Sequence, residues 1–264
     1  ALDLGLGGVG HRGSPKANPR FSGFAAAGAN RQHARMRPAD DLFAPAAAAD
    51  HGRDGGFVPI GLPEGWPTAE LAIAQEWLSP DAAATAMADL QVQIGWDTHR
   101  IRLFGRVVDA PRRSCWIGDP GAAYTYSRTR FEPRPWPPAL LPIRDRLQAQ
   151  TGGRFDSVLA NLYRDGRDSM GWHSDDEPEL GPRPLIASLS LGAERRFLLK
   201  PRDRRWRGPD GRPPRAFALA LPPGSLLLMA GDTQRHYLHA LPSTARPVGP
   251  RLNLTFRRVI GAVP

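Results

Sequence analysis

The chain has 264 residues, of which 41% are hydrophobic, and it carries a formal net charge of +9 with a pI of about 10.8. This length suffices for one sizeable domain with an appended segment, and the apolar runs are far too short to span a bilayer. The single cysteine, Cys115, excludes an internal disulfide and a cysteine-based zinc cluster, so we expect a cytoplasmic protein. The positive charge favours an anionic partner such as nucleic acid, but nearly all basic residues are arginines, as in GC-rich genomes.

Residues 1–66 are rich in Gly, Ala, Pro and Arg and show neither helical nor strand periodicity. Such a composition is typical of segments that cannot bury enough apolar surface to fold. We therefore predict a disordered tail over residues 1–66 and a folded domain over residues 67–264.

Two helices are predicted before residue 155. Ser79 offers a capping hydroxyl, Pro80 suits the first helical position, and Asp81 stabilises the positive end of the dipole. This helix runs to about Val92, with Leu90 facing the core. Apolar residues at helical spacing predict a second helix over 138–150.

From residue 155 onward the pattern changes to short strands separated by Gly and Pro. We predict strands at Ser157–Tyr163, Leu185–Leu191, Arg196–Lys200, Ala216–Leu221, Ser225–Ala230, Tyr237–Leu241 and Arg251–Val259. Such a series indicates a mainly β domain, an antiparallel sandwich or jelly roll, with the two helices packed outside one sheet.

His173 and Asp175 lie just after a predicted strand, separated by one residue. Residues i and i+2 on extended backbone point the same way, so both can reach one ion. A chance His-x-Asp is common in a chain with seven histidines, and the pair alone is weak evidence. A third ligand must come from a distant strand: we favour His239, which lies among apolar strand residues, over His236, which follows a loop-like stretch.

Two imidazoles and a carboxylate bind one face of Fe(II) in oxygenases, and they also occur at zinc sites of hydrolases. The chain contains no helical His-Glu-x-x-His motif of zinc proteases. The strand that begins at Arg251 favours iron, because its arginines can hold a small dicarboxylate beside the metal.

Polar and apolar residues alternate strictly along 251–257, with Arg251, Asn253, Thr255 and Arg257 on one face and leucine or phenylalanine on the other. An ordinary amphipathic strand would turn the polar face to water. Inside a barrel the same face would line a charged pocket for a cosubstrate. Asn161 and Tyr163, also spaced by two, can donate further hydrogen bonds there.

Several stretches together resemble the AlkB-like Fe(II)/2-oxoglutarate dioxygenases, and the DNA-repair branch most. They are Asn161-Leu-Tyr-Arg-Asp-Gly-x-Asp, Gly171-Trp-His-x-Asp-Asp-Glu177, Pro184-Leu-Ile-Ala-Ser-Leu-Ser-Leu-Gly192, His239-Ala-Leu-Pro242 and Pro250-Arg-Leu-Asn-Leu-Thr-Phe-Arg257. The resemblance covers residues 68–260 and leaves the tail unexplained. It implies a double-stranded β-helix, a relative of the jelly roll.

The resemblance also implies the chemistry of the site. The iron ligands would be His173, Asp175 and His239. Arg251 would hold the distal carboxylate of 2-oxoglutarate, and Arg257 the carboxylate beside the keto group, assisted by Asn161 and Tyr163. Such enzymes use O2 and 2-oxoglutarate to oxidise N-methyl groups of 1-methyladenine and 3-methylcytosine, and they release succinate, CO2 and formaldehyde.

On the substrate side, lesions of this kind carry positive charge, which a carboxylate beside the pocket would favour. We assign base contact to Glu177, although a solvated acidic turn is an equal alternative. Tyr124 and Tyr126 resemble residues that line the pocket for the flipped base. Phe104 resembles a finger that fills the gap in the duplex, unless it is an ordinary buried strand residue.

The segment 200–215 contains Arg204, Arg205 and one aromatic residue, Trp206, and we predict that this basic loop grips phosphates. We therefore expect a monomeric DNA demethylase, with no protein partner inferable from the sequence. Three alternatives remain: an RNA or protein demethylase on the same scaffold, a non-catalytic nucleic-acid-binding module, and a zinc-dependent hydrolase.

Overall fold

The computed structural model describes residues 56–103, 106–126, 129–203, 205–208 and 210–260. The helices are α1 (Pro80–Gln93), α2 (Leu141–Thr151) and the short α3 (Thr233–His236), with 3-10 turns at Pro138–Leu140 and Pro178–Leu180. Most of the remaining structure is β, which confirms the predicted fold class.

Two antiparallel sheets form the body of the domain. The larger has seven strands in the order β1 (Val58–Pro59), β2 (Glu70–Ala74), β13 (Leu226–Ala230), β10 (Ile186–Gly192), β15 (Arg251–Arg257), β8 (Ser157–Tyr163) and β5 (Arg113–Gly118). The smaller has four, in the order β12 (Phe217–Leu221), β11 (Arg195–Pro201), β14 (Tyr237–Leu241) and β9 (Met170–His173). The sequence-distant neighbours in each sheet are those of a jelly roll.

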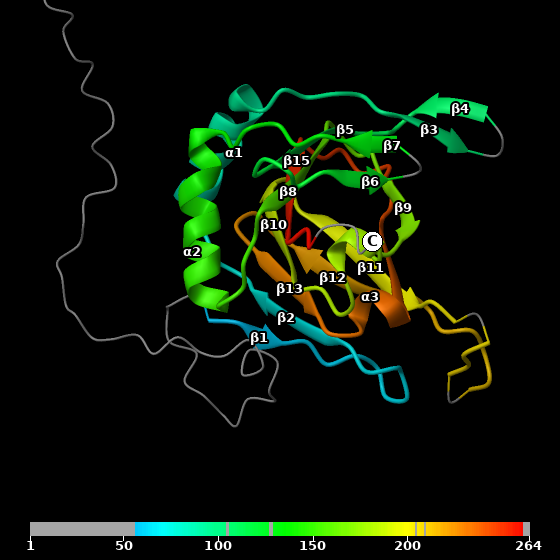
Figure 1. Cartoon of the computed structure of the whole chain (residues 1–264). Coiled ribbons are helices and arrows are strands. Elements are labelled where there is room, and N and C mark those ends of the chain that lie inside the picture. The colour runs from blue at the N-terminus through cyan, green and yellow to red at the C-terminus, as the bar shows by residue number, and fades with distance from the viewer. Residues whose placement is uncertain (1–55, 104–105, 127–128, 204, 209, 261–264) are drawn as a thin grey trace, which may run out of the picture. The chain divides into compact units, whose positions relative to one another are not determined.

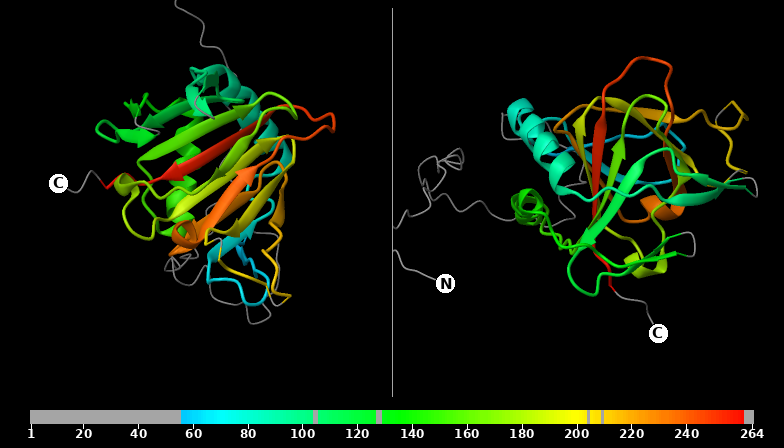
Figure 2. Two further views of the ribbon diagram at one scale, coloured as in Figure 1. Left: turned by 90° about the vertical axis from the view of Figure 1, so that its right-hand side faces the viewer. Right: turned by 90° about the horizontal axis from the view of Figure 1, so that it is seen from above.

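Two hairpins complete the described strands: β3 (Arg100–Leu103) with β4 (Arg106–Asp109), and β6 (Tyr124–Tyr126) with β7 (Thr129–Phe131). The β3–β4 hairpin lies on the side of the sheets away from α1 and α2 (Figures 1 and 2). No helix in the described ranges is long and apolar enough to cross a membrane.

Helices α1 and α2 lie against one face of the larger sheet (Figure 1). The Ser79 hydroxyl accepts a hydrogen bond from the amide of Ala82, so α1 begins at the predicted cap. Leu90 of α1 and Leu147 of α2 are fully buried in a core cluster that includes Phe256 of β15. The apolar face of β15 therefore packs under the helices, which turns its polar face away from them.

That polar face points into the space between the two sheets. Part of this space is filled by a second apolar cluster, in which Phe197, Leu199 and Tyr237 of the smaller sheet meet Leu227 and Met229 of β13. The rest is lined by polar side chains. The sandwich thus supplies a partly dry interior where charged groups interact more strongly than in water.

The domain begins earlier than the predicted boundary at residue 67. Val58 and Pro59 pair with β2, and Trp66 stacks on Tyr237 with ring centroids 6.0 Å apart. Residues 56–66 therefore belong to the folded domain, whereas residues 1–55 of the predicted tail lie outside the described residues.

The strands predicted by name all lie after residue 155, whereas the structure also has strands before it. Strand β2 lies next to β13, and β5 forms the edge of the larger sheet beside β8. Nearly every residue in both strands is buried. Because both faces are covered, these strands lack the polar and apolar alternation by which half-buried strands are detected.

Candidate metal and cosubstrate site

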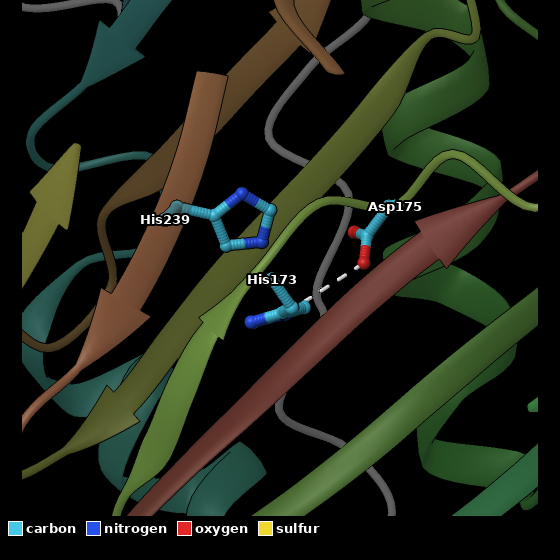
Figure 3. A group of neighbouring side chains, drawn as sticks. All are labelled: His173, Asp175 and His239. Atoms are coloured by element: carbon cyan, nitrogen blue, oxygen red, sulfur yellow. Dashed lines mark ion pairs between the residues drawn. The ribbon is translucent and has the colours of Figure 1, made fainter. Parts of the chain in front are cut away.

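Three predicted metal ligands meet between the sheets. Strands β9 and β14 run antiparallel and place His173 directly opposite His239, while Asp175 follows the end of β9. The candidate ligand atoms all lie within 4.8 Å of one another. Figure 3 shows the three side chains directed toward a common point. The alternative ligand, His236, ends α3 instead, with its Nδ1 3.3 Å from the carbonyl oxygen of Thr68.

Neighbouring groups hold each ligand in position. The Nδ1 of His173 lies 2.8 Å from the carbonyl oxygen of Gly171, so Nδ1 carries the proton and Nε2 is left as the metal-binding atom. The ring of His239 stacks on Phe197 at a centroid distance of 5.2 Å. The backbone amide of Asp175 donates a 3.0 Å hydrogen bond to the side chain of Gln234, which fixes the turn after β9.

The site's electrostatics favour the metal-binding protonation states. Burial lowers the pKa of His239 to about 3 and also lowers the pKa of His173, so both imidazoles are neutral at neutral pH. Burial by itself would raise the pKa of Asp175, but Arg257 and the two imidazoles outweigh it and lower that pKa. The set is thus two neutral nitrogen donors and one carboxylate.

The metal ligands open into a cavity whose other wall is the larger sheet. All four polar residues of β15 contribute to it, so the prediction of a pocket, and not a solvated sheet face, is confirmed for that strand. The described residues that line the cavity are Leu159, Asn161, Tyr163, Met170, His173, Asp175, Ser188, Phe197, Met229, His239, Ala240, Leu241, Arg251, Asn253, Thr255 and Arg257.

Arg251 is a buried cation in this cavity. Its side chain is 2% exposed, its Nη2 donates a 2.8 Å hydrogen bond to Ser190, and its Nε has no acceptor among the described residues. The ring of Tyr163 lies 5.5 Å from the guanidinium carbon. Burial lowers the pKa of Arg251 to about 10, so it stays charged at neutral pH. A buried cation with no carboxylate partner in the described part of the chain fits an anionic ligand.

Arg257 occupies the other end of the same strand, beside the metal ligands. Its Nη2 lies 2.8 Å from the Oδ1 of Asp175, and the two side chains are 3% and 4% exposed. A ligand held between Arg251 and Arg257 would therefore lie along β15 and reach the metal position with one end. This arrangement suits a short dicarboxylate.

The neighbouring strand β8 adds two of the predicted cosubstrate residues. Antiparallel pairing sets Asn161 opposite Asn253 and Tyr163 opposite Arg251. The amide nitrogen of Asn253 already donates to Ser188 at 2.8 Å and to a backbone carbonyl of β10. Asn253 therefore lines the cavity, but its NH2 group already donates both hydrogen bonds to β10. Its contact with a cosubstrate stays a prediction.

Two buried residues contact the site although the sequence pattern did not predict them. The Nε of Arg112 donates a 3.0 Å hydrogen bond to the Oδ1 of Asn161, and Gln234 holds the turn that carries Asp175. Neither belongs to a periodic strand or to a recognised motif. Only the spatial neighbourhood marks them as part of the site.

The predicted base contacts are less well placed. Glu177 is half-buried, precedes the 3-10 turn at Pro178–Leu180 and is not one of the described residues that line the cavity. Tyr124 and Tyr126 lie in β6, but their side chains are outside the described set, as is the whole of Phe104. These roles stay predictions.

The basic loop differs from expectation in its aromatic residue. Trp206 packs edge-on against Trp66 with centroids 6.0 Å apart, so it serves as an anchor for the loop. Arg205 is exposed and pairs with Asp203 at 3.0 Å, while Arg204 lies outside the described residues. The loop is therefore anchored to the domain by Trp206, and it exposes the side chain of Arg205 to solvent.

Comparison with known proteins agrees with this geometry. The sequence profile of the 2OG-Fe(II) oxygenase superfamily matches residues 70–257. DNA oxidative demethylase ALKBH2 of Homo sapiens is 42% identical over 161 residues, which are 61% of this chain and 61% of that protein. Alpha-ketoglutarate-dependent dioxygenase alkB homolog 3 of Bos taurus is 43% identical over 150 residues, 56% of this chain and 52% of that protein.

A plant relative extends the match. DNA oxidative demethylase ALKBH2 of Arabidopsis thaliana is 36% identical over 209 residues, 72% of this chain and 67% of that protein. The solved structure of OsALKBH1 shares the fold, with a TM-score of 0.50 and 18% identity over 74% of this chain and 100% of that one. The matched region spans about three fifths of the human relative's length. The profile match contains both the ligand triad and the arginine strand, and the chain belongs to the 2OG-Fe(II) oxygenase superfamily.

Proposed function

We propose that the protein is an Fe(II)- and 2-oxoglutarate-dependent dioxygenase that demethylates 1-methyladenine and 3-methylcytosine in DNA. The observation that carries the proposal is that one cavity is lined by both the His173, Asp175 and His239 triad and Arg251. Arg251 is buried, and its Nε has no hydrogen-bond acceptor among the described residues. Relatives named DNA oxidative demethylase ALKBH2, 42% identical over the matched region, support the choice of substrate.

The residues present fit the metal and the cosubstrate that the superfamily's name specifies. His173, Asp175 and His239 would hold Fe(II) from one side. Arg251 would bind the distal carboxylate of 2-oxoglutarate, and Arg257 the carboxylate next to the keto group. When bound, iron and 2-oxoglutarate supply the oxidant that converts an N-methyl group to a hydroxymethyl group, which leaves as formaldehyde.

The protein's own contribution is to orient these groups and to keep water out. The hydrogen bond from His173 to Gly171 sets its tautomer, and the Phe197 ring shields His239 from solvent. Phe197 and Met229 of the apolar cluster between the sheets line the cavity beside the metal ligands. A base stacked in a duplex cannot reach a metal held between the sheets, so it must leave the stack first.

The positive charge of the chain and the tethered arginine loop support a nucleic-acid substrate. For the lesion itself, Glu177 stays the predicted base contact, since a carboxylate favours cationic methylated bases over neutral ones. The acid that precedes it, Asp176, forms an ion pair with Arg202. If Glu177→Ala leaves the preference for 1-methyladenine over a neutral lesion unchanged, this assignment is wrong.

The decisive assay supplies Fe(II), ascorbate, 2-oxoglutarate and an oligonucleotide that bears 1-methyladenine, and it measures formaldehyde. We expect His173→Ala to reduce formaldehyde to background and His236→Ala to retain turnover. Formaldehyde from methylated RNA or peptide, with none from methylated DNA, would move the activity to those substrates. Formaldehyde release that persists without 2-oxoglutarate would refute the proposed reaction.

A further inference from the structure

Arg112 is a buried arginine at the edge of the cosubstrate site. It immediately precedes β5, and its side chain is 8% exposed. The backbone around it is held by hydrogen bonds from the amide of Ser169 to the carbonyl of Pro111 and from the amide of Arg112 to the carbonyl of Ala110. The side chain thus leaves a fixed stretch of backbone, and within the described residues it forms no ion pair with a carboxylate.

Within the described part of the chain, the side chain of Arg112 forms one hydrogen bond, from its Nε to the Oδ1 of Asn161 at 3.0 Å, and both side chains are buried. Asn161 lies in the middle of β8, between β5 and β15, and lines the cavity. Its amide nitrogen has no hydrogen-bond partner among the described residues. One half of this amide therefore faces Arg112, and the other is available to the cavity.

The chemistry of the pair decides which half faces which way. An asparagine amide can turn over and present either its oxygen or its NH2 group to a neighbour. An arginine guanidinium can only donate hydrogen bonds. Arg112 can therefore form this hydrogen bond only when the amide oxygen of Asn161 faces it. In that orientation the NH2 group of Asn161 is turned toward the cavity. An anion such as a carboxylate needs a donor there and is repelled by an amide oxygen.

We propose that Arg112 is a positioning residue for 2-oxoglutarate: it locks the amide of Asn161 with its NH2 group toward the cosubstrate. The inference rests on the proposed role of Asn161 in binding 2-oxoglutarate. It assigns Arg112 no contact with the iron or with the cosubstrate. The effect that we propose passes through Asn161, and the double-mutant cycle below separates it from a general structural or electrostatic role of the Arg112 charge.

The test is a double-mutant cycle on cosubstrate binding, read out by calorimetry under anaerobic conditions with Mn(II) in place of iron. The variants are Arg112→Gln, Asn161→Ala and the two together. Gln can donate or accept, so Arg112→Gln frees the amide of Asn161 to turn over. We expect Arg112→Gln to raise the Kd for 2-oxoglutarate about tenfold or more, the effect of losing one hydrogen bond to a charged group.

In the Asn161→Ala background, Arg112→Gln should change the Kd by less than about twofold, because the amide it orients is gone. Arg112→Lys, which can only donate, should restore more of the affinity than Arg112→Gln. Arg113→Gln is the matched control: it removes the charge of the adjacent, exposed arginine and should leave the Kd unchanged. Circular dichroism and thermal unfolding of each variant check that the fold is retained, and Arg112→Lys covers the case in which Arg112→Gln does not fold.

Three results would overturn the inference. Equal effects of Arg112→Gln with and without the Asn161 amide would show that Arg112 acts elsewhere. An unchanged Kd in the Arg112→Gln single variant would show that the Asn161 amide keeps its orientation without Arg112. An unchanged Kd in Asn161→Ala would remove Asn161 from the cosubstrate site and the inference with it. None of these results depends on turnover, so the formaldehyde assay tests the proposed reaction separately.

Discussion

The guanidinium of Arg257 lies 2.8 Å from the carboxylate of Asp175, and the two side chains are almost completely buried. Strand β15 thereby supplies the counter-ion for a metal ligand that follows β9 in the other half of the sandwich. A bound Fe(II) would place a second positive charge beside the same carboxylate. The charge of Arg257 would then be available to a carboxylate of the cosubstrate.

This ion pair leads to a prediction about the metal-free protein. Arg257→Ala leaves the buried Asp175 without its partner, so the free energy of unfolding should fall by about 3–5 kcal/mol. Adding Mn(II) should recover part of the loss, because the metal replaces the missing charge. Urea unfolding with and without Mn(II) measures both effects. Arg258→Ala, which removes an exposed arginine one position along, is the matched control and should leave stability unchanged. A metal-free Arg257→Ala as stable as the parent would contradict this account.

The depressed pKa of His239 predicts a loss of stability in acid. The unfolded chain binds a proton at this histidine near pH 6.5, whereas the folded protein does so only near pH 3. Between these values the unfolded state holds more protons, so stability is fully present above pH 6.5 and falls as the pH drops. The slope from this one group is at most about 1.4 kcal/mol per pH unit.

Urea unfolding of the metal-free protein between pH 7 and 4.5 measures this slope. His239→Gln removes the titrating group and should flatten the curve over that range. Equal slopes for the two proteins would assign the acid sensitivity to other groups. In the metal-loaded protein the same protonation competes with the metal, so acidification should also release the ion.

The packing of Trp206 on Trp66 predicts a tethered basic loop. Trp206→Ala should release the loop, which would speed cleavage by trypsin after Arg205 and Arg207. It should also weaken oligonucleotide binding several-fold while leaving 2-oxoglutarate binding intact, because the ordered loop loses less entropy on binding. Trp206→Phe keeps an aromatic contact and is the control. Unchanged cleavage in Trp206→Ala would show that other contacts hold the loop.

The contact between α1 and the larger sheet predicts a large cost for one core truncation. Leu90 is 0% exposed, and Leu90→Ala should lower the free energy of unfolding by about 2–5 kcal/mol. Val92 lies on the same helix but is 86% exposed, and Val92→Ala should stay within about 0.5 kcal/mol of the parent. Chemical denaturation of both variants checks the orientation of the helix, and similar losses would refute it.

Much of the fold could be read from local pattern. The predicted bounds of β8 and β14 agree with the structure, and α1 begins after Ser79 as expected. Strand β15 ends at Arg257, two residues before the predicted end, because the amide of Val259 turns to the side chain of Asp156. Helix α1 exposes one face to solvent, and the two faces of β15 meet different surroundings, a polar cavity and an apolar core. In both elements the periodicity of apolar residues therefore records the direction of the core.

The metal ligands could be predicted from the order of His173, Asp175, His239 and the arginine strand along the sequence. In the structure the three ligands lie together. Their meeting is a property of the tertiary structure, because His173 and His239 come from strands that pair across a long stretch of chain. The hydrogen bond from Arg112 to Asn161 and the burial of β2 and β5 on both faces left no trace in local periodicity. Side-chain alternation reports which way a residue faces, whereas a partner that is distant in the chain becomes a neighbour only when the sheets pack.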